Sequence, residues 1–296
     1  MLVGAILIAL IFIGFSVVLN SVVYTETVAG GSSIEVTGDV NEFNKEARRN
    51  ARILTIRVNH QGNYSNFDTI NSNLESNFTE YSRLLSESYA DTGSVYVNVS
   101  YDGNQTDGNR IVQDVDDNFE KGGNPNWFAF DTDNKDIGWF LLNVDVENTS
   151  QSTPSRVIIT DTGGSSLTVS VKQSGSARLM VNSSLDGSHI SNSTCQPENG
   201  RVLLDLVEGS SSTSSCSFNA TGKLDPPYDS VKFENADAIQ GKYSLVVNQT
   251  SGLGFSECST GDKPCKMPAV WEISITSRYQ SSSISYQNSQ NVTVYE

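Results

Sequence analysis

Basic residues are scarce in this sequence. Its 296 residues contain 19 Lys and Arg against 34 Asp and Glu, which gives a net charge of −15. Charged residues make up only 18% of the chain, below the usual quarter, and much of the polarity comes from uncharged side chains. Because binding to nucleic acid needs Lys and Arg to neutralise phosphates, this composition excludes nucleic acid as an expected partner. The profile is typical of surface and secreted proteins.

Histidine is scarcer still, with His60 and His189 alone, and there is no Cys-x-x-Cys pair. This excludes the usual ligand spacings of a zinc site. We expect both histidines on the surface in loops, where nothing marks either as a catalytic base. A Gly-rich phosphate loop followed by Lys is also missing. We therefore expect no enzymatic activity, no metal and no cofactor. A secreted or anchored hydrolase is kept as a minor hypothesis.

Two segments have a local pattern that is associated with chemistry. Asp161-Thr162-Gly163 matches one half-site of an aspartic protease, but that mechanism needs two carboxylates and there is no second copy. A turn between two strands is the expected structure. The acidic residues Asp131, Asp133, Asn134 and Asp136 could bind calcium, but Lys135 and Asp136 occupy the positions where an EF-hand loop needs a ligand and Gly. A solvated acidic loop is favoured, with calcium as the alternative.

An apolar run opens the sequence and continues to Leu19, and the first charged residue is Glu26. About twenty apolar residues in a helix match the thickness of a bilayer core. The nearest basic residues lie between Lys45 and Arg52, which by the positive-inside rule would place the polar body in the cytoplasm. The cysteines and the Asn-x-Ser/Thr triplets described below indicate the opposite side. The conflict disappears if a basic leader has been removed just before residue 1, so we expect a mature form.

Two amphipathic helices are predicted after a break at residues 28–33. Asp39 followed by Glu42 resembles a capping box, and an apolar stripe then continues to Val58. His60 to Asn63 is predicted to be a turn, Ser65 is a cap candidate, and a second stripe covers residues 67–89. We expect an αα-hairpin here.

At residues 95–101 apolar and polar residues alternate, which predicts a half-buried strand. Residues 102–136 are expected to be irregular. Strand-like runs follow, separated by clusters of Gly, Ser, Asn and Pro, at 137–147, 156–161, 166–173, 177–182, 201–207, 241–248, 269–277 and 290–295. The predicted class is α+β: a long N-terminal hydrophobic helix, a short helical hairpin and a C-terminal antiparallel β-sandwich. The expected domains are 1–30, 31–92 and 93–296, with the core of the sandwich at about 137–296.

Four cysteines, all in the last third, suggest two disulfides in a chain that leaves the cytosol. Three pairings of Cys195, Cys216, Cys258 and Cys265 are possible. We favour Cys195–Cys216 with Cys258–Cys265, because these pairs close short loops.

Ten Asn-x-Ser/Thr triplets (sequons) occur, against about six expected by chance, so N-linked glycans are predicted. Asn98 is expected on the solvent side of its strand, and Asn77 is a weaker candidate because it borders an apolar stripe. The ten are Asn63, Asn77, Asn98, Asn104, Asn148, Asn182, Asn192, Asn219, Asn248 and Asn291.

The apolar start, which runs from Leu2 to Leu19 and continues through Asn20-Ser21-Val22-Val23-Tyr24, resembles mature archaeal type IV pilins and archaellins. The resemblance covers residues 1–29 directly and the remainder only as a β-rich body after a helix. Bacterial type IV pilins usually have Glu at the fifth position, where this chain has Ala5. That difference favours the archaeal branch.

The resemblance implies a structural subunit of an extracellular type IV pilus-like filament. The subunit would sit in the membrane before assembly and then form a helical homo-oligomer through its N-terminal helix, with glycosylated β domains outside for surface attachment. The alternative is a monomeric membrane-anchored surface glycoprotein or adhesin. Small residues among large apolar ones let such helices pack closely. The expected assembly positions are Leu2, Ile6, Ala9, Ile13, Gly14 and Val17.

Overall fold

The computed structural model describes residues 33–61, 66–92, 95–175, 177–213, 216–218, 224–249, 253–258, 263–282 and 284–295. The chain divides into two compact units, residues 1–46 and 47–296. The predicted hydrophobic helix over residues 1–30 lies outside the described residues. Of the helices within them, none has the length and apolar character needed to span a bilayer.

Both helices of the expected hairpin are present, as α2 (Ser33–Gln61) and α3 (Phe67–Thr92). The predicted stripes are buried, with Ala51 and Leu74 fully excluded from solvent. The expected cap at Asp39 is wrong, because α2 begins at Ser33 and Asp39 lies inside it. The cap of α3 is Asn66, whose Oδ1 accepts the N–H of Thr69 at 2.9 Å.

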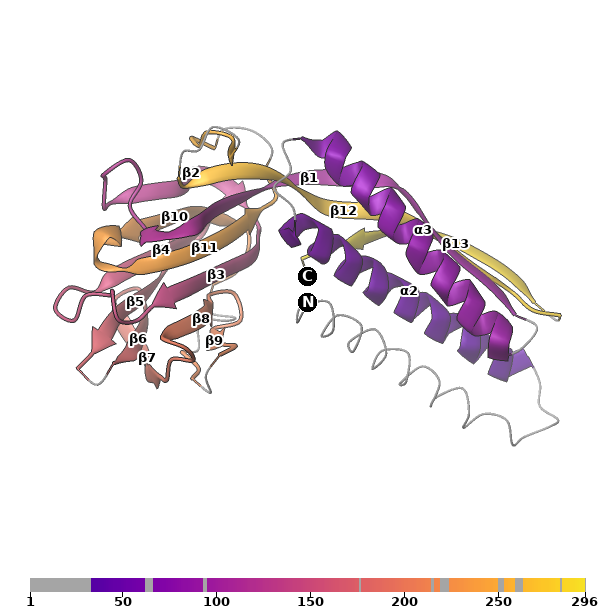
Figure 1. Ribbon diagram of the computed structural model, residues 1–296, viewed down its shortest axis with the longest axis horizontal. Helices are drawn as coiled ribbons and strands as arrows, with labels where there is room; N and C mark the ends of the chain where they lie inside the picture. Colours follow the sequence, from indigo (N-terminus) through magenta and orange to yellow (C-terminus); the bar gives the residue numbers. More distant parts are fainter. Residues whose placement is uncertain are drawn as a thin grey trace. The chain divides into compact units, whose positions relative to one another are not determined.

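The strands form two antiparallel sheets (Figure 1). Along the chain they are β1 (Tyr96–Asn118), β2 (Trp127–Lys135), β3 (Ile137–Asp145), β4 (Ser155–Asp161), β5 (Ser166–Ser174), β6 (Arg178–Leu185), β7 (Ser188–Cys195), β8 (Arg201–Asp205), β9 (Ser210–Ser211), β10 (Tyr228–Glu234), β11 (Gln240–Val247), β12 (Cys265–Gln280) and β13 (Ser285–Thr293). The seven-stranded sheet has the order β13-β12-β1-β11-β3-β8-β9, and the six-stranded sheet has the order β2-β10-β4-β5-β6-β7.

The α+β class predicted from the sequence is wrong. The described chain is mostly β, with two antiparallel sheets and two helices. The main reason is segment 102–136, which was expected to be irregular but forms most of β1 and all of β2. Its Gly and Asp residues obscure the strand period, and pairing with long neighbouring strands overrides their weak β propensity.

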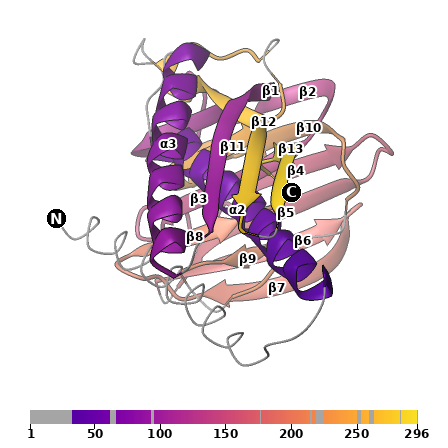
Figure 2. The same ribbon diagram turned by 90° about the vertical axis from the view of Figure 1, so that its right-hand side faces the viewer.

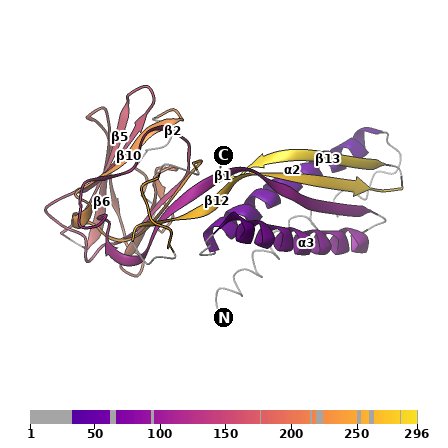
Figure 3. The ribbon, with the colours of Figure 1, turned by 90° about the horizontal axis from the view of Figure 1, so that it is seen from above.

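Strands β1 and β12 pair along nearly their whole length, from Tyr96 opposite Gln280 to Val112 opposite Cys265. Three register shifts lie between Tyr101 and Asp107 on β1, and such bulges bend a strand pair. On one side of the shifts the pair lies beside β13 and α3; on the other side β1 also pairs with β11 (Figures 2 and 3). The β1–β12 pair is therefore covered by a helix in one part and belongs to the packed pair of sheets in the other.

The two sheets share one apolar core. It includes Phe140 and Leu142 from β3, Val169 from β5 and Val181 from β6, all with no exposed surface. Aromatic rings also belong to it, and Trp127 stacks on Phe233 with their ring centroids 4.4 Å apart. Burial of these side chains is the main force that holds the sheets together.

Two disulfides are present, Cys195–Cys216 and Cys258–Cys265, and both are the local pairings. Cys195 ends β7 of the six-stranded sheet, while Cys216 lies close after β9 of the seven-stranded one. The first disulfide therefore ties the two sheets at one side. The second joins Cys258 to Cys265, the first residue of β12. The two residues of this pair are 7 apart in the sequence, and those of the first pair are 21 apart.

Loop length predicts that the two disulfides differ in their contribution to stability. Replacing Cys195 and Cys216 by Ser should lower the free energy of unfolding by about 3 kcal/mol, and replacing Cys258 and Cys265 by about 2 kcal/mol. Chemical denaturation under oxidising conditions measures both, with reduced protein as the control in which the differences vanish. A larger loss from the Cys258–Cys265 pair would contradict this order.

Candidate functional site

The end of α2 is fastened to the seven-stranded sheet by buried polar contacts, and we call this set of contacts the α2 joint. At its centre is Asn59, which has no exposed surface. Its Oδ1 accepts the N–H of Val270 at 2.9 Å, and its Nδ2 donates to the carbonyl of Val270 at 2.8 Å and to the hydroxyl of Tyr295 at 2.9 Å. One side chain thus pairs both backbone groups of Val270, as a neighbouring strand would.

Arginines complete the α2 joint. Arg110 of β1 donates from Nη1 to the carbonyls of Asn59 and His60, at 3.4 and 3.2 Å. These are carbonyls of the last helical turn, which have no partner within the helix and carry its negative dipole end, so a cation is favourable there. About two turns before them, Arg52 donates from Nε to the carbonyl of Val294 at 2.7 Å.

His60 lies in the α2 joint and not in a surface loop, which corrects the expectation from the sequence. It is a helical residue whose ring lies 4.5 Å from that of Trp139, centroid to centroid, and 6.3 Å from that of Tyr295. Burial first, and then the charge of Arg110, lower the pKa of His60 from 6.5 to about 4. It is therefore neutral at neutral pH. Its ring packs against aromatic neighbours, and none of its described contacts is with a carboxylate.

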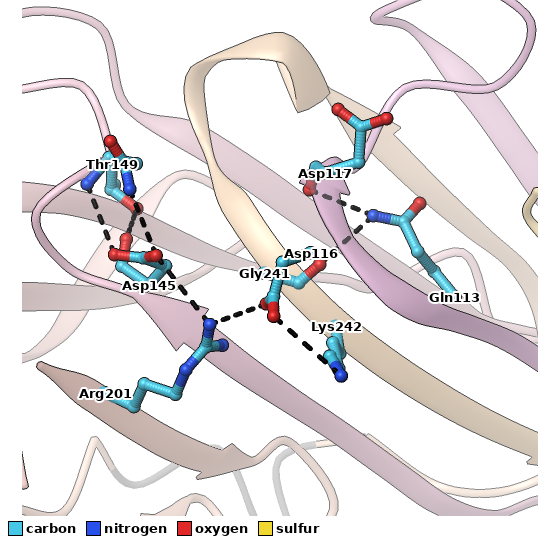
Figure 4. A network of polar contacts seen from close by, with 9 residues as sticks. Gln113, Asp116, Asp117, Asp145, Thr149, Arg201, Gly241 and Lys242 are labelled. Atoms are coloured by element: carbon cyan, nitrogen blue, oxygen red, sulfur yellow. Dashed lines mark hydrogen bonds and ion pairs between the residues drawn. The ribbon is translucent and has the colours of Figure 1, made fainter. Parts of the chain in front are cut away.

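A row of alternating charges crosses four strands of the same sheet (Figure 4). Arg201 of β8 contacts Asp116 of β1 at 2.7 Å and Asp145 of β3 at 3.7 Å, and Lys242 of β11 lies 3.8 Å from Asp116. Beside this row the buried amide of Gln113 donates to the carbonyls of Asp117 and Gly241. These charges neutralise one another, and such partly exposed pairs contribute little to stability.

Gly241 is required next to this row. Its φ is +146°, and a Cβ built there would lie 2.1 Å from the carbonyl oxygen of Asn143. It pairs with Asp117 beyond the register shift of β1. Close approach of two backbones is the reason for glycine at this position.

A groove of about 520 Å³ lies between α3 and the first part of β1. Its arginine, Arg83, is held between Glu80 at 2.7 Å and Glu87 at 2.5 Å on its own helix. The charged residues that line the groove are Arg83 and Glu87, which pair with each other, and Glu75, and its described lining contains no His or Cys.

The structure places the other sequence-predicted features as follows. Asp161 to Gly164 form a tight turn between β4 and β5, with Gly164 N–H bonded to the carbonyl of Asp161 at 3.0 Å, so the turn prediction is confirmed. Asp131 to Lys135 belong to β2 and are not a loop. Within the described part of the chain, no group of three or more His, Cys, Asp or Glu could hold a metal.

The sequons fall into distinct environments. Asn63 and Asn219, and all the assembly positions, lie outside the described residues. Asn148, Asn192 and Asn291 are exposed, while the rest are half-buried, and four of these half-buried amides donate hydrogen bonds to the protein: Asn77 to Asn73, Asn98 to Ser82, Asn104 to Asp107, and Asn248 to Asp136. The expected solvent orientation of Asn98 is therefore wrong, because its amide turns back to α3.

Sequence reasoning missed Asn59 and Arg110. An Asn at the end of an amphipathic stripe and a single Arg in a polar segment carry no signal of burial. The available signal was helical spacing, because Asn59 lies four residues after Thr55 and eight after Ala51, which are both fully buried.

No family model, no curated protein and no solved structure matches this chain.

The α2 joint predicts a large cost for removing the Asn59 amide. Asn59→Leu leaves the N–H and carbonyl of Val270 buried and unpaired, so the free energy of unfolding should fall by about 2–5 kcal/mol. Urea denaturation of the chain in detergent measures the change. Asn41, exposed on the same helix, offers the matched control Asn41→Leu. Equal stability of the two variants would show that Val270 finds other partners.

A pH dependence follows from His60. Its pKa is lower in the folded state than the ordinary 6.5, so its contribution to stability is complete above pH 6.5 and is lost as the pH falls towards about 4. The free energy of unfolding of the wild type should fall more steeply over this window than that of His60→Gln. Denaturation at several pH values checks it, and parallel profiles would exclude His60 as the source.

Proposed function

We propose that this protein is a structural subunit of an extracellular type IV pilus-like filament. The observation that carries the proposal is a chain segment without any charge before Glu26, followed by a body that is mostly β and contains two disulfides. Disulfides persist outside the cytosol. An apolar segment of this size must be covered by lipid or by protein, and copies of itself are the partner that every subunit has available.

The apolar segment supplies the driving force for assembly. At about 25 cal/mol per Å² of apolar surface, burying roughly twenty such residues contributes tens of kcal/mol before entropy losses are subtracted. Gly4, Ala5, Ala9, Gly14 and Ser16 interrupt the large side chains and would let neighbouring segments approach closely. The membrane holds the segment before assembly, and other subunits replace the lipid afterwards.

The body is suited to remain outside such a fibre. Helix α2 is continuous from Ser33 to Gln61, and its last turns are fixed to β12 through Asn59 and to the segment after β13 through Arg52. A pull that acts on the last turns of α2 would thus be passed to β12, which with β1 forms the longest strand pair among the described residues. This attachment suits a subunit under load and supports the filament over a loosely tethered body.

A charge in the apolar segment tests the proposal. Ile13→Asp should abolish fibres, since an unpaired carboxylate cannot be buried among apolar neighbours. The matched variant Ile13→Leu should leave fibres at the wild-type level. Fibres are counted by negative-stain electron microscopy of material sheared from cells, and the amount of each variant at the cell surface is measured in parallel.

The alternative, a monomeric membrane-anchored surface glycoprotein, predicts a different result. No variant, the wild type included, would then yield fibres, and detergent would extract the chain from the membrane as a monomer.

A further inference from the structure

Each of the two sheets ends in two edge strands, and the first part of β1 also has no neighbouring strand on one side. Unpaired edges are templates for association with other chains, and proteins protect them by charge, proline, shortness or cover. The ends are β13 and β9 in the seven-stranded sheet and β2 and β7 in the six-stranded one.

Three of these edges have a visible protection. β9 has only two residues. β2 carries the charged residues Asp131 and Lys135. The first part of β1, where β11 does not reach, lies against α3, and its Val99 N–H donates to the hydroxyl of Ser82 at 3.0 Å.

The remaining two edges, β7 and β13, are long and lack these protections in the described part of the chain, apart from the end of β7, where Cys195 is bonded to Cys216 and Ser193 Oγ donates to the carbonyl of Ser217. β7 has eight residues and β13 nine, and neither contains Asp, Glu, Lys, Arg or Pro. β13 is regular as well, pairing without a register shift from Glu272 opposite Thr293 to Gln280 opposite Ser285. By sequence and geometry these are the edges most open to pairing with another chain.

Each of these two edges carries an exposed sequon, Asn192-Ser193-Thr194 on β7 and Asn291-Val292-Thr293 on β13. Among the described strands, the other sequons that lie within a strand are half-buried: Asn98 and Asn104 on the first part of β1, which α3 covers, and Asn182 on the inner strand β6. Asn182 of β6 lies directly opposite Asn192. Such neighbours are only about 5 Å apart, too close for both to carry a sugar chain.

We propose that N-linked oligosaccharides at Asn192 and Asn291 protect the β7 and β13 edges from pairing with other chains. The oligosaccharide comes from a lipid-linked phosphate donor: its C1–O bond to phosphate breaks, a C1–N bond to the Asn Nδ2 forms, the amide loses a proton, and the lipid phosphate leaves. The sugar chain protects the edge by its bulk and hydration, as charged side chains protect the edge of β2. This inference depends on the extracellular location in the proposed function, because the donor and the transferase act on chains that leave the cytosol.

Site occupancy is the first test. Full-length protein from the producing cells is deglycosylated enzymatically in H₂¹⁸O, which marks each formerly occupied Asn as ¹⁸O-labelled Asp, and its peptides are then analysed by mass spectrometry. We expect label at Asn192 and Asn291, with Asn182 and Asn98 as unlabelled internal controls. Label at Asn182 or Asn98 with empty edge sites, or no label at all, would overturn the proposal. If fibres form but the edge sites are empty, the filament proposal holds and the glycan proposal fails. If the edge sites are occupied but no fibres form, only the filament proposal fails.

The protective role is tested by three substitutions at one position. Asn291→Gln removes the glycan and leaves the edge uncharged, so the mass of the detergent-solubilised protein from light scattering should at least double relative to wild type. Asn291→Asp also removes the glycan but introduces a charge on the edge, so the mass should stay at the wild-type value. Thr293→Ser keeps the sequon and should behave as wild type. Equal masses for Asn291→Gln and Asn291→Asp, whether raised or not, would contradict edge protection.

Discussion

The antiparallel pairing of β1 with β12 is the interaction on which the rest of the structure depends. It continues from Tyr96 opposite Gln280 to Val112 opposite Cys265 across three register shifts. On one side of the shifts it forms the floor for α3, and on the other it joins the sheet that faces the six-stranded sheet. Since contacts between residues far apart in sequence are slow to form and costly in entropy, we expect this pairing to limit the folding rate.

Buried polar groups fix α2 to this strand pair. Asn59 uses its amide on both backbone groups of Val270, and Arg110 satisfies carbonyls at the end of α2. Apolar burial alone would hold the helix on the sheet without fixing its position along it. Directional hydrogen bonds in a low-dielectric interior define one position, because every other position leaves buried groups unpaired. The α2 joint is therefore a structural connection with a place in the proposed load path.

Much of the secondary structure could be predicted from the sequence, and the failures have physical reasons. Apolar periodicity identified both helices and eight of the strands. It missed β2, β7, β9 and β10, and also the greater part of β1, where Gly and Asp hide the alternation. The faces of β7 are polar because it is an edge strand. The class was wrong for the same reason, because the unrecognised strands make the described chain mostly β. For the α2 joint, composition gave no signal, because the burial of Asn59 and Arg110 depends on partners far away in the sequence: Val270 is 211 residues from Asn59, and Asn59 is 51 residues from Arg110.

The central claim is that copies of this chain assemble through their apolar segments into a fibre with the β body outside. Cryo-electron microscopy of fibres sheared from wild-type cells tests it most directly. The account predicts fibres with density for residues 1–25 along the axis and for the disulfide-bonded β body at the surface. Cells that carry the protein but yield no fibres, with the chain recovered as a monomer in detergent, would contradict it.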